Sequence, residues 1–331
     1  SVGVISVGEA GSGKSLLIAR LRQHVGKDSN ASVITIRLRQ GRLGHIWQPI
    51  RKQLFTELLR PEGNSETRTT GLMRILANRF PQWAAACQGG VGGLMGILQG
   101  KNANTKLGPY LERDPQSAML DFELRRVLSH LTDPELNGIA ADWLRGEQLG
   151  EEDLTRLKLS TESLSPVERE SRASEVVSSF LQLVGNSTLL VLCFDEVEAI
   201  QSGNWDKAVL REFATAAVTI QGIEGPRVVI TTLRFNLHTD LREAADVTSL
   251  QKLATTGPIF FKMLTWEQML RIVHARISSE PTCKLERQHY PPESDWPLTR
   301  PFLEEFYREN KLALTPRHIL MACARKFDQI K

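Results

Sequence analysis

Val2-Gly-Val-Ile-Ser-Val7 runs directly into Gly8-Glu9-Ala10-Gly11-Ser12-Gly13-Lys14-Ser15-Leu16, and this stretch decides the fold. The segment from Gly8 to Ser15 completes the pattern G-x-x-x-x-G-K-S of a phosphate-binding loop. Glycines in such a loop let backbone N–H groups turn inward around a β-phosphate, at the positive end of the following helix. Lys14 is expected to reach the β- and γ-phosphates, and the Ser15 hydroxyl is expected to bind Mg²⁺. Residues 8–16 therefore predict a site for a nucleoside triphosphate such as ATP.

The residues on both sides of the loop agree with this prediction. A β-branched strand precedes it, and an apolar helical face follows it, formed by Leu16, Leu17, Ile18 and Leu21. A glycine-rich turn that binds nothing is the alternative, but a turn of that kind needs neither the strand nor the helix.

The composition is that of an ordinary globular protein. The chain has 331 residues, of which 41% are hydrophobic, enough for one large α/β domain and a smaller one. Its four cysteines, Cys87, Cys193, Cys283 and Cys323, have no C-x-x-C spacing, which argues against a structural zinc and a disulfide framework. We therefore expect a cytoplasmic location. No apolar stretch approaches the length of a membrane span, so no membrane partner is expected, and a strand at residue 2 without an initial Met suggests missing N-terminal residues.

Strands and helices alternate along most of the chain, which predicts a parallel sheet with right-handed crossovers. Strands are expected at Ser32–Leu38, Thr188–Asp195, Pro226–Thr232 and Pro258–Met263. Helices are expected at Ile46–Leu59, Leu72–Phe80, Ala118–Leu131, Pro134–Leu144, Ala173–Val184 and Trp266–Ile277. A capping box between Thr265 and Gln268 opens the last of these helices. Gly89–Gly100 is rich in glycine and predicts a hinge or mobile loop.

Two acids, Asp195 and Glu196, follow the most continuously apolar strand. Such a strand lies in the middle of a parallel sheet, and ligands bind at the carboxyl edge of open α/β sheets. Asp195 is expected to hold Mg²⁺ directly or through water, and Glu196 to orient and activate the attacking water. At the end of the next strand, the Thr232 hydroxyl is expected to sense the γ-phosphate or its water. For Asp195 and Glu196, the alternative is an ordinary turn at the strand end with solvent-exposed carboxylates and no ligand.

The second informative stretch is Leu314-Thr315-Pro316-Arg317-His318-Ile319-Leu320. Thr315 is a good N-cap and Pro316 a good first helical residue, which places Arg317 in the first turn of a helix. A cation is unfavourable at the positive end of a helix dipole, so the position predicts an anion opposite Arg317. A surface arginine without a partner is the alternative.

Basic residues gather near the N-terminus, although the net charge of the chain is only +3. A subset on and after the second strand is placed to meet the phosphate backbone of double-stranded DNA. An equally good alternative is a solvated face that guards an edge strand. The subset consists of Arg37, Arg39, Arg42, Arg51 and Lys52.

Together, the loop, the strand ending in Asp195-Glu196, the polar-ended fourth strand and the late Pro316-Arg317 resemble the AAA+ superfamily of ATPases. The resemblance implies a sheet ordered 5-1-4-3-2, a helical lid after the fifth strand, and ATP at a subunit boundary of a homo-oligomer, with an arginine finger from the neighbour. The stretch Phe261-Lys-Met-Leu-Thr-Trp-Glu-Gln-Met-Leu270 is similar to the origin-recognition/initiator and transposition-regulator branch. Ala141-Asp-Trp-Leu-Arg-Gly-Glu147 resembles ATP-binding proteins of BREX-type phage-defence islands.

The chain departs from the superfamily pattern in one large way, because Lys14 and Asp195 are much farther apart in sequence than the core requires. Residues 61–165 are therefore expected to be a helical insertion that recognises an effector protein. Residues 1–60 and 166–264 would form the core, and residues 265–331 the helical lid. The finger candidates, in order of preference, are Arg242, Arg234 and Arg211; Arg234 is alternatively a sensor within its own subunit.

These features lead to one main hypothesis and two alternatives. The main hypothesis is an ATP-binding and ATP-hydrolysing oligomeric switch that acts on DNA and recruits effectors in replication, transposition or anti-phage defence. The second is a STAND-like signalling scaffold, which oligomerises with ATP on a protein trigger and has little turnover. Glu196 favours hydrolysis, while the low net charge disfavours a dedicated DNA machine. A metabolic kinase is the third, but no residues suggest a small-molecule acceptor site.

Overall fold

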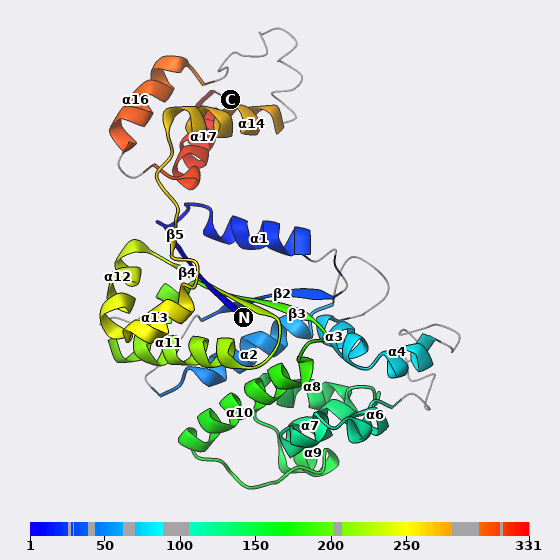
Figure 1. Ribbon diagram of the computed structural model, residues 1–331. Coiled ribbons are helices and arrows are strands. Elements are labelled where there is room, and N and C mark those ends of the chain that lie inside the picture. The colour runs from blue at the N-terminus through cyan, green and yellow to red at the C-terminus, as the bar shows by residue number, and fades with distance from the viewer. Residues whose placement is uncertain are drawn as a thin grey trace. The chain divides into compact units, whose positions relative to one another are not determined.

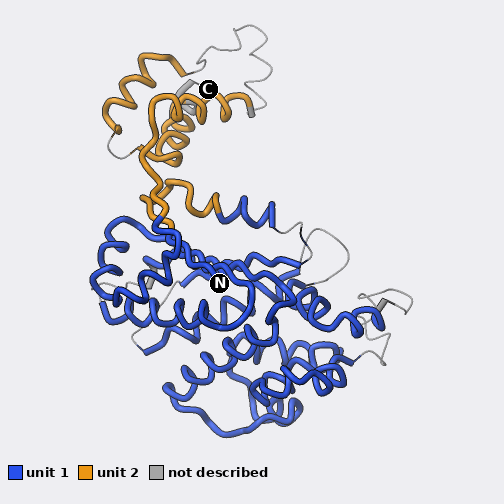
Figure 2. Tube along the Cα trace, in the orientation of Figure 1, with its two compact units in different colours: residues 1–5, 18–258 blue, residues 6–17, 259–331 orange. Residues whose placement is uncertain are grey.

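A computed structural model describes residues 1–25, 28, 30–38, 44–61, 70–88, 106–200, 207–279, 298–311 and 314–330 (Figure 1). The chain divides into two compact units (Figure 2). Unit 1 contains residues 1–5 and 18–258, and unit 2 contains residues 6–17 and 259–331. The predicted hinge at Gly89–Gly100 lies outside the described residues.

Five strands form one sheet in the order β2-β3-β4-β1-β5. The strands are β1 (Val2–Val7), β2 (Ala31–Arg37), β3 (Leu189–Asp195), β4 (Arg227–Leu233) and β5 (Ile259–Phe260). This order confirms the 5-1-4-3-2 arrangement, and β2 pairs with β3, β3 with β4 and β1 with β5 in parallel. The fifth strand is shorter than expected, because only Ile259 and Phe260 of the apolar stretch pair with β1.

Strand β3 is buried on both faces, as its continuous apolar sequence predicts. On one face, Val191 and Cys193 pack in a cluster with Ile18 of α1 (Lys14–Val25). On the other face, the ring of Phe194 meets that of Phe213 in α11 (Lys207–Gly222) edge-on, with centroids 5.3 Å apart. This double packing fixes the strand that carries the two predicted acids.

Short helices form the described part of residues 61–165, and these helices belong to unit 1. The short elements are α3 (Gly71–Arg79), α4 (Pro81–Gln88), α6 (Gly108–Arg113), η1 (Ser117–Met119), α7 (Phe122–His130), α8 (Asn137–Arg145) and α9 (Glu151–Arg156). Three of them, α3, α7 and α8, pack on α2 (Trp47–Leu58) or α10 (Pro166–Val184). Helices α2 and α10 meet through the edge-on rings of Phe55 and Phe180.

Helix α10 begins seven residues earlier than the sequence analysis expects, at Pro166 instead of Ala173. Its N-terminus is a complete capping box, in which the Glu168 amide donates to the Ser165 hydroxyl and the Ser165 amide donates to the Glu168 carboxylate. The remaining elements of unit 1 are η2 (Val197–Ile200), α12 (Phe235–Ala244) and α13 (Val247–Leu253).

Unit 2 combines the phosphate-binding loop with three lid helices, α14 (Trp266–Ser279), α16 (Arg300–Asn310) and α17 (Pro316–Ile330). Their common core includes Met269 of α14, Leu303 of α16 and Ile319 of α17. The predicted capping box of α14 is confirmed, because the Thr265 amide donates to the Gln268 side chain and the Gln268 amide donates to the Thr265 hydroxyl.

Three of the four cysteines lie among the described residues. Cys87, Cys193 and Cys323 are free and buried, and burial raises the pKa of the Cys193 thiol to about 12. Within the described ranges, every helix is too short or too polar to cross a bilayer.

Candidate functional site

The phosphate-binding loop turns at two glycines with left-handed backbone, Gly11 at φ 81° and Gly13 at φ 106°. Glycine adopts this conformation without the strain that a side chain would add. The turn closes where the Ser12 amide donates to the Glu9 carbonyl at 3.1 Å, and α1 begins where the Leu17 amide donates to the Gly13 carbonyl. The sequence pattern therefore forms the expected strand, loop and helix.

Lys14 lies inside this turn and is only 7% exposed. Its ammonium group donates to the carbonyl oxygens of Gly8 at 2.5 Å and Glu9 at 3.0 Å. A buried ammonium requires acceptors, and the loop backbone supplies them. The arrangement places a positive charge within the loop, whereas the next residues, Ser15 and Leu16, are exposed at the start of α1.

The loop residues fit a phosphate group on two observations. An added Cβ at Gly8 would lie 2.7 Å from both Phe261 Cβ and Ser12 Oγ, so only a glycine backbone fits there. The Ser12 hydroxyl oxygen is buried and has no hydrogen-bond partner in the described part of the chain. A buried unpaired hydroxyl is costly unless a ligand or water satisfies it.

The start of α17 lies against the loop within unit 2. An added Cβ at Gly11 would be 2.5 Å from Arg317 Cβ and 3.2 Å from Thr315 Oγ1. Thr315 is buried and its hydroxyl accepts from the His318 amide at 3.4 Å, as expected of an N-cap. The start of the helix that carries the exposed Arg317 thus lies against the phosphate-binding loop, and the anion expected opposite Arg317 stays a prediction.

In unit 1, Asp195 and Thr232 lie side by side at the ends of β3 and β4. The buried Thr232 hydroxyl donates to Asp195 Oδ1 at 2.6 Å, so it holds the carboxylate that is predicted to bind Mg²⁺. Glu196 follows in a left-handed conformation, at φ 57°, and its side chain is exposed. This uncommon backbone for a glutamate turns the chain sharply after the strand.

Glu198, in η2, is a residue that the sequence analysis missed. Its Oε1 accepts from Arg234 Nε at 3.2 Å, while its Oε2 is buried without a partner in the described ranges. Arg234, a finger or sensor candidate, is therefore held beside the acidic strand end of its own chain. The sequence does contain a signal for Glu198. It follows Asp195 by three residues, and a short turn can place both acids at the same edge of the sheet.

The other two finger candidates differ in environment. Arg242 is exposed on α12. Burial of His238, one turn earlier, lowers the pKa of this histidine, and the charge of Arg242 lowers it further. Arg211 instead donates through Nε to the Ala244 carbonyl at 2.9 Å, where it satisfies the last turn of α12. This structural contact within one chain argues against Arg211 as the finger.

The expected DNA-facing set is corrected at Arg51, which is 7% exposed and donates to the carbonyls of Trp143 and Leu144. Packing of α8 on α2 buries most of this side chain, so it does not lie on the exposed surface expected for contact with duplex DNA. Lys52 pairs with Glu147 at 2.9 Å, and Arg37 is exposed. The positions of Arg39 and Arg42 lie outside the described residues.

A comparison with protein families gives one match. The family model described as AAA ATPase domain matches residues 3–230, which is more than half of the chain. Neither the curated proteins nor the solved structures contain a match. The matched region includes the phosphate-binding loop, both strand-end acids and most of β4.

Proposed function

This chain belongs to the AAA ATPase domain family, and we propose that it is an ATP-hydrolysing switch in which the lid helix α17 responds to the bound phosphates. The close approach of Arg317 and Thr315 to Gly11 carries this proposal. The loop and α17 share one compact unit and lie against each other at Gly11, so we expect bound phosphate to act on the start of this helix.

Four of the predicted site residues have a chemical role in this proposal. Lys14 and the loop amides bind the β- and γ-phosphates, and Glu196 takes the proton of the attacking water. Mg²⁺ would neutralise charge on the phosphates, and Ser15 and Asp195 would hold it. The described residues contain no group of three or more His, Cys, Asp or Glu side chains for a metal. One carboxylate with a hydroxyl and phosphate oxygens is a donor set that suits Mg²⁺.

The test of the switch is Arg317→Ala. We expect ATP turnover to fall between about 10- and 100-fold, with less than about a threefold change in ATP affinity, because the guanidinium stabilises charge that develops in the transition state. Single-turnover hydrolysis and equilibrium binding of a fluorescent ATP analogue measure the two effects separately.

Arg325→Ala is the matched control, since Arg325 is exposed later on the same helix. Turnover should be unchanged in this variant. Normal turnover in Arg317→Ala would show that Arg317 is a surface arginine without a role in hydrolysis. It would also contradict the proposed link between the loop and α17.

We also propose a homo-oligomer in which Arg242 acts on the ATP of a neighbouring subunit. Its exposure on α12, without an ion pair in the described part of the chain, supports this role. Arg242→Ala should retain ATP binding and lose at least about tenfold in turnover. Mixing it with Lys14→Ala should restore part of the turnover, because some neighbouring pairs then have one complete site. Failure of every mixing ratio to restore turnover would argue against a shared site.

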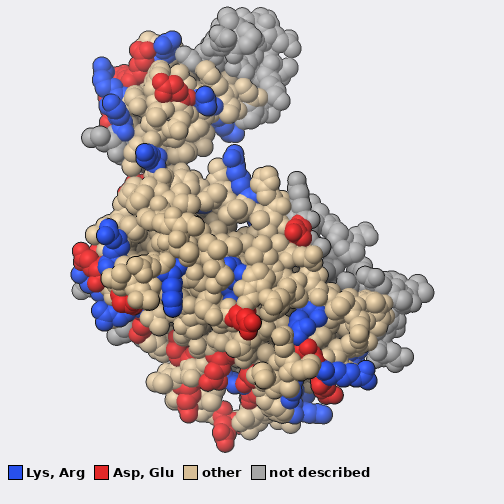
Figure 3. Space-filling model, in the orientation of Figure 1, with Lys and Arg blue, Asp and Glu red and all other residues tan. Residues whose placement is uncertain are grey.

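Action on DNA and recruitment of an effector through residues 61–165 remain proposals for the biological role. The burial of Arg51 and the pairing of Lys52 favour the alternative, a STAND-like scaffold with a protein trigger. Figure 3 supports the same alternative, because basic and acidic side chains are mixed on the described surface of unit 1 that it displays.

Duplex DNA is the reagent that separates the two roles. If the chain acts on DNA, the ATP turnover should rise several-fold with duplex DNA, and the stimulation should weaken with salt as phosphate contacts are screened. Steady-state turnover with and without duplex at two salt concentrations measures this. An unchanged rate would make the protein-triggered scaffold the leading function.

A further inference from the structure

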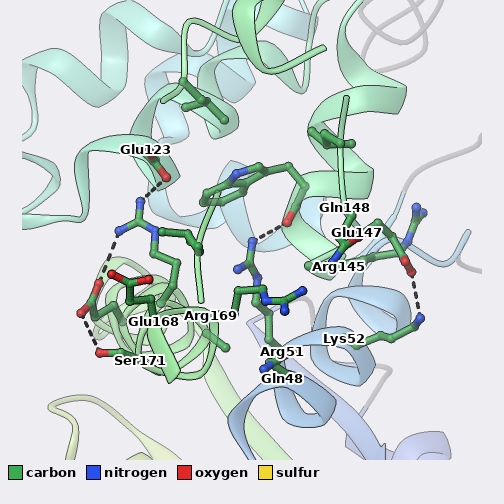
Figure 4. A pocket seen from close by; sticks show the side chains of 18 of the residues that line it. Gln48, Arg51, Lys52, Glu123, Arg145, Glu147, Gln148, Glu168, Arg169 and Ser171 are labelled. Carbon is green, nitrogen blue, oxygen red and sulfur yellow. Dashed lines mark hydrogen bonds and ion pairs between the residues drawn. The ribbon is translucent and has the colours of Figure 1, made fainter. Parts of the chain in front are cut away.

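Unit 1 contains a cleft of about 1330 Å³ that none of the proposed ATP roles uses. It is lined by residues of α2, α8, α9 and α10 and by the segment 159–164 that leads to α10 (Figure 4). This volume exceeds the roughly 300–1,000 Å³ of most small-molecule sites, so a small ligand would occupy only part of the cleft. All lining residues belong to unit 1, and none belongs to the phosphate-binding loop.

Arg51 lies in this cleft as a buried cation without a carboxylate partner in the described ranges. Its Nε donates to the Leu144 carbonyl at 3.0 Å and Nη2 donates to the Trp143 carbonyl, which satisfies the last turn of α8. Its guanidinium also stacks 4.5 Å from the centroid of Trp143. Burial, with the nearby charge of Arg172, lowers the pKa of Arg51 to about 10, so it remains charged at neutral pH.

The partly buried acids near this cation already pair with Arg172 of α10. Arg172 Nη1 pairs with Asp121 Oδ2 at 2.5 Å, and Nη2 pairs with Glu123. It also reaches the more exposed Glu175 at 3.4 Å. Hence these carboxylates neutralise Arg172 through direct contacts and leave Arg51 with none.

A third guanidinium, that of Arg169, lines the same cleft one turn before Arg172 on α10 (Figure 4). Its Nε is buried and has no acceptor among the described residues. A buried charged donor without an acceptor costs free energy, because water no longer solvates it. Two arginines from facing helices therefore bring positive charge to one cleft, and Arg169 also has an N–H donor without an acceptor among the described residues.

We propose that this cleft binds a small ligand through a single oxyanion, a carboxylate or a phosphate, which accepts hydrogen bonds from Arg169 and Arg51. Guanidinium groups present N–H donors in a fork that matches both oxyanions. The ligand is small and carries few charges, because the cleft also presents glutamates. Glu151 and Glu162, which form no ion pair in the described part of the chain, would repel a polyanion such as nucleic acid.

The rest of the cleft suits a polar ligand body. The segment before α10 contributes hydroxyl groups, and α2 contributes an amide side chain, so hydrogen-bonding groups surround the two arginines. These groups are Gln48, Ser160, Thr161 and Ser163. This site is separate from the ATP roles, and its test does not depend on ATP turnover.

The test is calorimetric titration of the 331-residue chain with inorganic phosphate and, separately, with acetate. Both titrations use the Lys14→Ala background, so that the phosphate-binding loop does not compete for phosphate. One of the two probes should bind with one-to-one stoichiometry, and its identity distinguishes a phosphate from a carboxylate ligand. In this background, the further substitution Arg169→Gln should weaken the binding at least about tenfold. A tenfold loss corresponds to a binding free energy of about 1.4 kcal/mol, which is what one charged hydrogen bond contributes.

Arg145→Gln is the matched control, because Arg145 lines the same cleft but already pairs with Asp142 at 2.7 Å. It should change the affinity less than about twofold. Thermal unfolding checks that both variants fold, and Arg169→Gln should not lower the midpoint because it removes an unsatisfied donor. Lack of binding by both probes, or equal losses in the two variants, would overturn the proposal.

Discussion

Lys14→Ala is expected to lower the affinity for ATP by about 1000-fold, equivalent to about 4.1 kcal/mol, and to abolish turnover at ordinary ATP concentrations. Lys14 supplies the only side-chain cation of the loop, and its ammonium already lies inside the turn, where it donates to the Gly8 and Glu9 carbonyls. An alanine supplies neither the charge nor the donors. Equilibrium binding of a fluorescent ATP analogue measures the loss.

Lys207→Ala is the control, because Lys207 is half-exposed and pairs with Glu243 at 2.7 Å in unit 1. Its ATP affinity should equal that of the unaltered chain. Lys14→Met serves as a second variant, since its long side chain fills the turn if the alanine disturbs the loop. Near-normal ATP affinity in both Lys14 variants, with folding confirmed by circular dichroism, would overturn the phosphate-binding role of the loop.

The fold was largely predictable because its signals are local. The glycine spacing around Lys14 specifies the strand, loop and helix, and the apolar run of β3 specifies a central strand. The sheet order came from the resemblance, because strand patterns alone do not determine which strands become neighbours. The N-cap at Thr315 was also a local signal, which placed Arg317 in the first turn of α17.

The errors arose where tertiary packing decides. Arg51 neighbours the apolar Ile50 on α2, and only the packing of α8, more than 80 residues later in the chain, explains its burial. The late start expected for α10 was different, because the pattern from Ser165 to Glu168 is a local capping-box signal that went unused. The spacing from Asp195 places Glu198 near the strand end, but its pairing with Arg234, at the N-cap of α12, depends on tertiary packing.

Glu196→Gln is expected to leave ATP bound and to lower turnover by about 1000-fold, because the amide keeps the side-chain shape and loses the basic function. The left-handed backbone at Glu196 directs the chain away from β3, and the exposed carboxylate lies next to Asp195 in sequence. ATP affinity should change less than about twofold, since the phosphate-binding groups are untouched. Single-turnover hydrolysis measures the chemical step without product release.

Glu198→Gln is the matched control, since it removes one carboxylate two residues away. Loss of the Glu198 carboxylate acts through Arg234, whose Nε lies 3.2 Å from Glu198 Oε1. Turnover should therefore fall less than about tenfold, and the ATP affinity should stay unchanged. If the two variants lose turnover equally, the negative charge of the strand end matters more than a base at residue 196. If Glu196→Gln hydrolyses ATP normally and Glu198→Gln does not, the buried oxygen of Glu198 becomes the candidate base.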